Sequence, residues 1–79
     1  MTTAKILLNT IESVKDFVNI VSKFDAAMDL SSGRYIVDAK SIMGIFSMNL
    51  SRSMELCIHD DGAEAGEVLA QLQGYLIKE

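Results

Sequence analysis

The chain has 79 residues, which is enough for one domain with one hydrophobic core, and its 49% hydrophobic content argues against a disordered segment. The net charge is −4 and the seven basic residues are scattered from Lys5 to Lys78, which argues against a nucleic-acid-binding protein because such proteins need a concentrated positive surface. Cys57 is the only cysteine and every apolar run is short, so we expect a cytoplasmic protein without a disulfide, a signal peptide or a membrane span.

The first quarter of the chain predicts a strand followed by a helix. Residues 5–8 form a short apolar run that suits a buried strand. From Thr10 on, apolar residues recur at every third or fourth position, which predicts a helix with Thr10 as its N-cap and Glu12 in its first turn. The buried face of this helix is expected to contain Ile11, Val14, Phe17, Val18, Val21 and Phe24.

The middle of the chain predicts a hairpin and then a short helix. Residues 26–30 alternate between apolar and polar positions, residues 31–33 are a turn signal, and residues 35–37 are β-branched or aromatic. Ser41 follows this second strand and is a suitable N-cap for a helix over residues 42–48.

The last third predicts one more strand and a second long helix. Residues 54–58 alternate in hydrophobicity, and Asp61 with Glu64 three residues later is close to a capping box. The acidic run around these residues (Asp60, Asp61, Glu64 and Glu67) is best interpreted as a solvated helix start. The buried stripe of this helix is expected to contain Ala65, Val68, Leu69, Leu72 and Leu76.

The order is therefore strand, helix, strand, strand, short helix, strand, helix, within one domain that spans residues 1–79. This order favours an α+β fold in which both long helices cover one face of a four-stranded antiparallel sheet. Five side chains are expected to be deeply buried: Phe17, Val21, Phe24, Leu69 and Leu72.

Residues 39–44 read A-K-S-I-M-G, and this stretch resembles the regulatory-serine motif of the HPr family, the histidine-containing phosphocarrier proteins of the bacterial sugar phosphotransferase system. The resemblance extends over essentially the whole chain, and the central stretch is its most specific part. It implies an HPr-like open-faced β-sandwich and a protein that is not itself an enzyme and needs no cofactor or metal. It also implies that Ser41 is the target of an HPr kinase/phosphorylase, and that the partners are phosphotransferase-system proteins or a catabolite-control transcription regulator. An exposed apolar docking patch would consist of Ile42, Met43, Phe46 and Met48, with Ile45 in the core.

The junction between the first strand and the first helix departs from the family pattern. Family members carry a G-x-H-A-R-P-A type motif there, whose histidine accepts phosphate from enzyme I. Here residues 8–15 read L-N-T-I-E-S-V-K, without histidine, arginine or proline, and Thr10 stands about where the histidine would. A threonine hydroxyl is a poor nucleophile without an adjacent base, and Glu12 would repel an incoming phosphate. The sequence thus predicts a family member without the usual phosphocarrier site.

Two alternatives to a regulatory role stay open. The chain could be a degenerate module that keeps only the fold and binds a partner without being phosphorylated. It could also be a phosphocarrier with an unusual acceptor, for which His59, the only histidine, is the sole imidazole. The neighbouring carboxylates favour an ordinary solvent-facing strand histidine instead, and a Cys57/His59 pair supplies too few ligands for zinc.

Overall fold

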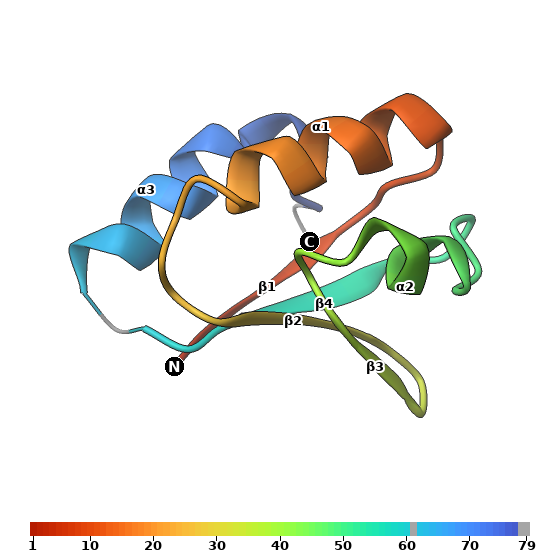
Figure 1. The fold of residues 1–79 in the computed structure, drawn as a ribbon, viewed down its shortest axis with the longest axis horizontal. Helices are drawn as coiled ribbons and strands as arrows, with labels where there is room; N and C mark the ends of the chain where they lie inside the picture. Colours follow the sequence, from red (N-terminus) through yellow and green to blue (C-terminus); the bar gives the residue numbers. More distant parts are fainter. Residues whose placement is uncertain (61, 78–79) are drawn as a thin grey trace.

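Four antiparallel strands form one sheet with the strand order β1-β4-β2-β3 (Figure 1). The computed structural model describes residues 1–60 and 62–77. The strands are β1 (Thr2–Ile6), β2 (Met28–Ser32), β3 (Tyr35–Asp38) and β4 (Met54–Ile58). The predicted four-stranded antiparallel sheet is confirmed. The first strand lies earlier than the predicted residues 5–8, because its pairing with β4 runs from Thr2 to Ile6.

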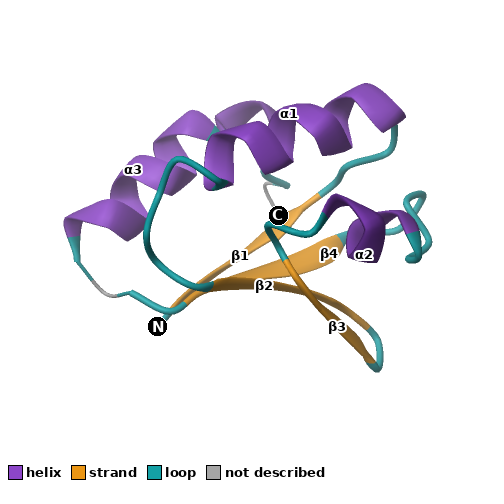
Figure 2. Ribbon diagram, viewed as in Figure 1, coloured by secondary structure: helices purple, strands orange, loops and turns teal. Residues whose placement is uncertain are grey.

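The helices lie on one face of this sheet, as Figure 2 shows, and the predicted layer arrangement is confirmed. They are α1 (Ile11–Val21), α2 (Ile42–Phe46) and α3 (Ala63–Gln71), and a 3-10 turn η1 (Gln73–Tyr75) follows α3. None of the helices within residues 1–60 and 62–77 is both long and apolar enough to cross a membrane. The opposite face of the sheet is left uncovered by these helices (Figure 2).

The core lies between the sheet and the two long helices. Alternate residues of β2 and β4 point toward the helices and are buried, as the period-two pattern predicted. Among the five side chains expected to be deeply buried, Phe17, Val21 and Leu72 are fully buried. Phe24 and Leu69 are only partly buried and pack against the edge of the core. For Phe24 the reason is that α1 ends at Val21, so Phe24 no longer follows the helical period.

Two apolar residues assigned to helix faces lie elsewhere. Ile11 is the first residue of α1 and is 62% exposed, because the helix enters the core only at its next inward position, Val14. Leu76 lies beyond the end of α3, where its extended backbone forms a bridge with Ile6 at the edge of the sheet. The chain therefore leaves the helix earlier than its hydrophobic period indicates.

The start of α3 also differs from the expected cap. The N-cap position is occupied by Gly62, and Asp61 lies outside the described residues. The carboxylate of Asp60 accepts hydrogen bonds from the backbone N–H groups of Gly62 at 3.0 Å and Ala65 at 3.1 Å. Asp60 thus provides acceptors for free N–H groups at the start of α3, which is the role that the sequence analysis expected of Asp61. Glu64, in the first turn, accepts a hydrogen bond from the backbone of Ala26 at 2.8 Å.

Candidate functional site

Ser41 occupies the N-cap of α2, as predicted, and is exposed. Its Oγ accepts a hydrogen bond from the backbone N–H of Gly44 at 3.3 Å. The turn before it is held by Asp38, whose backbone carbonyl accepts from the N–H of Ser41 at 3.0 Å and whose carboxylate accepts from the N–H of Lys40 at 2.9 Å. The serine hydroxyl therefore has a defined position at the junction of β3 and α2, and it remains accessible to a partner.

Gly44 allows α2 to lie close to β3. A Cβ at this position would stand 3.2 Å from the Cβ of Val37 and 3.3 Å from the Oγ of Ser41. Contacts of this length are tighter than ordinary van der Waals packing. The glycine of the A-K-S-I-M-G stretch thus has a packing role, because it lets α2 lie close to Val37 of β3 and to the cap serine.

Lys40 connects this turn to the end of the first long helix. Its Nζ donates a hydrogen bond to the backbone carbonyl of Phe24 at 2.7 Å, just beyond α1. A cation is favourable there because the carbonyl groups at a helix C-terminus carry partial negative charge. No local pattern predicts this contact, since the two residues are 16 positions apart.

The short helix α2 divides its apolar residues between the core and the surface. Ile45 is fully buried, as predicted, and Ile42 is partly buried. Met43 is 76% exposed and Phe46 is 37% exposed, so both point away from the sheet. We call Met43 and Phe46, with Ile42 at their edge, the α2 patch. The structure therefore brings an exposed apolar surface next to Ser41, within the same helix.

Met48 does not belong to this surface. It was predicted to be exposed with the docking residues, but its side chain is only 8% exposed and forms part of the core. The reason is that α2 ends at Phe46, and the backbone N–H of Met48 then bonds to the carbonyl of Ile45 at 3.0 Å in a tight turn. This turn directs Met48 back toward the sheet.

The junction before α1 holds its threonine in a capping box. The Oγ1 of Thr10 accepts from the backbone N–H of Ser13 at 3.0 Å, and the Oγ of Ser13 accepts from the N–H of Thr10 at 3.1 Å. The predicted N-cap is confirmed. This arrangement stabilises the helix start. Among the described hydrogen bonds, the hydroxyl oxygen of Thr10 takes part in this helix cap and has no imidazole or carboxylate as a partner.

His59 lies at the other end of the sheet from Thr10. It directly follows β4, whose last residue pairs with Thr2 at the start of β1, whereas Thr10 follows the end of β1. Its Nε2 stands 2.6 Å from a carboxylate oxygen of Asp29, and both side chains are more than one-third exposed. The expected solvent-facing histidine is confirmed, although it lies just past the strand. In the part of the chain that the structure describes, no cluster of three or more potential metal ligands occurs.

Comparison with known proteins gives the following similarities. The family model described as the PTS HPr component phosphorylation site matches residues 13–78. The structure is similar to that of HPr-C-His from Thermoanaerobacter tengcongensis, with 29% identity, coverage of 91% of this chain and 90% of that one, and a TM-score of 0.74. It is also similar to the phosphocarrier protein HPr from Bacillus anthracis, with 23% identity, 96% coverage of both chains and a TM-score of 0.72. A Mycoplasma histidine-containing phosphocarrier protein has 20% identity, coverage of 92% and 86%, and a TM-score of 0.67. The last two similarities support the fold.

Proposed function

Because this chain belongs to the HPr family of the phosphotransferase system, we propose that it is a regulatory member that acts through phosphorylation of Ser41 and docking of the α2 patch. The observation that carries the proposal is the position of an accessible Ser41 hydroxyl at the start of the helix that exposes Met43 and Phe46. In this role the protein catalyses no reaction of its own and works in the cytoplasm. A kinase of the HPr kinase/phosphorylase type would modify the serine, and a catabolite-control transcription regulator would bind the modified form.

Phosphorylation of Ser41 is compatible with the fold. The modification adds a charge of about −1.5 to −2 at neutral pH. The serine is exposed, and its oxygen already accepts from the N–H of Gly44, so a phosphate there meets backbone N–H groups of the first helical turn. The charge would therefore change the surface more than the structure. A basic partner gains charge-assisted hydrogen bonds to the phosphate while it covers the two exposed apolar side chains.

Methionine and phenylalanine are suitable anchors for such a partner. Met43 has an unbranched, adaptable side chain, and Phe46 supplies a rigid aromatic surface. Exposed apolar side chains that cluster, as Met43 and Phe46 do, are typical of sites that contact other proteins. Both lie on the same helix as the serine, so a single partner surface spans the phosphate and the patch.

The first experiment compares the wild type with Ser41→Ala after treatment with HPr kinase/phosphorylase and ATP, and measures binding to the catabolite regulator. We expect the wild type to gain one phosphate and to bind, and Ser41→Ala to do neither. Equal binding by both proteins, or modification at another residue, would support the degenerate-module alternative instead.

A second pair of variants tests the patch. Met43→Asp should weaken the phosphorylated complex by about tenfold, which corresponds to about 1.4 kcal/mol, without unfolding the domain. Ile36→Asp is the matched control, because Ile36 is 70% exposed and lies on β3, outside the α2 patch. An equal loss in both variants would mean that added negative charge, rather than the patch, determines the affinity.

The phosphocarrier alternative has its own test. Incubation with enzyme I and phosphoenolpyruvate should leave no acid-labile phosphate on this chain. A phosphohistidine at His59 would contradict the proposal. Replacement of Thr10 by histidine alone should not restore transfer, because the junction also lacks the family's arginine and proline.

A further inference from the structure

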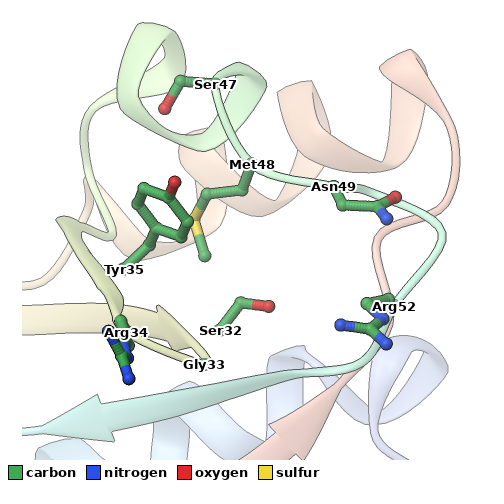
Figure 3. Close-up of a pocket in the computed structure, with 8 residues that line it drawn as sticks. All are labelled: Ser32, Gly33, Arg34, Tyr35, Ser47, Met48, Asn49 and Arg52. Atoms are coloured by element: carbon green, nitrogen blue, oxygen red, sulfur yellow. The ribbon is translucent and has the colours of Figure 1, made fainter.

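A concave site of about 450 Å³ lies between the β2–β3 hairpin and the loop that connects α2 to β4. Figure 3 shows the side chains that line it. They include Ser32, Gly33, Arg34 and Tyr35 from the hairpin, and Met48, Asn49 and Arg52 from the loop. The site is separate from Ser41 and from the α2 patch, none of whose residues lines it. Its volume is sufficient for a small organic molecule.

The charge of this site is opposite to that of the chain. Arg34 and Arg52 are the only arginines in the sequence, they are 18 positions apart, and both line this one site. Among residues 1–60 and 62–77, no Asp or Glu lines the site, whereas the whole chain carries a net charge of −4. Within the described residues, neither arginine forms an ion pair or a side-chain hydrogen bond. Two cations in a concave surface without a carboxylate create a local positive potential that attracts anions.

The rest of the lining adds neutral donors and an apolar wall. In Figure 3 the guanidinium of Arg52 extends toward the hydroxyl of Ser32, and the amide of Asn49 lies on the same side of the site. The ring of Tyr35 and the thioether of Met48 lie next to each other on another side. Arg34 projects from the tip of the hairpin, away from Arg52 in this view. One arginine thus reaches into the site and the other supplies charge at its rim.

We propose that this site binds a small phosphate monoester, with the phosphate at Arg52, Ser32 and Asn49 and the organic part against Tyr35 and Met48. A guanidinium presents a planar pair of N–H donors that matches two phosphate oxygens, and the hydroxyl and amide donors can serve the third. Two arginines balance a phosphate monoester, which carries a charge of about −1.5 to −2 at neutral pH, better than they balance a single carboxylate. The apolar wall favours a flat or hydrophobic organic group over a highly hydrated one.

The test uses the complete protein and phenyl phosphate as the probe, because this molecule combines a phosphate monoester with a flat apolar ring. Backbone amide chemical shifts are followed by NMR during titration at neutral pH and constant ionic strength. We expect saturable shifts at Gly33, Tyr35 and Asn49. Phenol lacks the phosphate and benzoate carries only one charge, so both should bind at least about tenfold more weakly.

Variants that each remove one positive charge distinguish binding at this site from a general attraction of the phosphate to the cations of the protein. Arg52→Gln should weaken binding of phenyl phosphate by about tenfold or more, and Arg34→Gln by less, because Arg34 lies at the rim. Lys23→Gln removes the same charge from an exposed residue outside the site and should leave binding unchanged. Arg52→Lys keeps the charge but not the planar pair of donors, and should bind with intermediate affinity.

Two results would overturn the proposal. One is the absence of saturable shifts at these amides, and the other is an equal loss of binding in Arg52→Gln and Lys23→Gln. Both arginines are exposed, so circular dichroism should show unchanged folding in their variants. The titration is carried out on protein that has not been treated with a kinase, so its outcome is independent of the role proposed for Ser41.

Discussion

Replacement of Met48 by alanine is expected to destabilise the domain far more than the same replacement at Met43. The two methionines are five positions apart, yet Met48 is 8% exposed and Met43 is 76% exposed. Alanine at position 48 removes the buried atoms Cγ, Sδ and Cε. If each is treated as a methylene, its burial contributes about 0.8 kcal/mol to the free energy of unfolding. The transfer free energy alone is therefore about 2 kcal/mol, and the cavity left behind adds to it, within the range of about 2–5 kcal/mol for such substitutions.

The corresponding change at position 43 should be small. A surface substitution of this kind usually changes the free energy of unfolding by less than about 0.5 kcal/mol. For a domain of this size, a loss of 2 kcal/mol lowers the melting temperature by about 8–16 °C. Thermal unfolding followed by far-ultraviolet circular dichroism can separate the two variants easily. A Met48→Ala protein that melts within 2 °C or so of the wild type would contradict the buried position, and a large loss in Met43→Ala would contradict the exposed one.

Three further substitutions test the core, the cap and one titrating group. Leu72→Ala should lower the free energy of unfolding by about 2–5 kcal/mol, because the side chain is fully buried, and a urea midpoint near that of the wild type would contradict this. Thr10→Ala should cost about 1 kcal/mol by removing its half of the capping box with Ser13, and an unchanged midpoint would mean that the box contributes nothing. Partial burial first, and then the charge and hydrogen bond of the Asp16 carboxylate at 3.3 Å, raise the pKa of Tyr75. The neutral phenol is thus favoured by folding, so its contribution to stability is present below about pH 10 and is lost as the pH rises through the folded-state pKa. Spectrophotometric titration should show a lower tyrosine pKa in Asp16→Asn, and an unchanged curve would contradict the role of the carboxylate.

Features that depend on residues close together in the chain can be predicted from the amino-acid sequence alone. Ser41 and Thr10 cap their helices because each side chain bonds to a backbone N–H three residues ahead, which local geometry already permits. The alternation in residues 54–58 identified the buried side of β4, because successive strand residues point to opposite faces. The resemblance around the A-K-S-I-M-G stretch identified the family for the same reason, since that motif is contiguous.

Where the chain leaves its helices and strands, and which distant residues line one surface, depends on tertiary contacts. The period of the last helix continues to Leu76, but pairing with Ile6 draws that residue into extended backbone instead. The sequence placed Met43 and Met48 in one short helix and in one docking patch, whereas the turn after Phe46 puts Met48 in the core and leaves Met43 in solvent. Arg34 and Arg52 carry no local signal that links them, because they line one site only when the hairpin folds beside the loop before β4. Helix and strand propensities depend on neighbours in the chain. The burial of a side chain, and the gathering of two arginines around one site, depend on which surfaces the fold brings together.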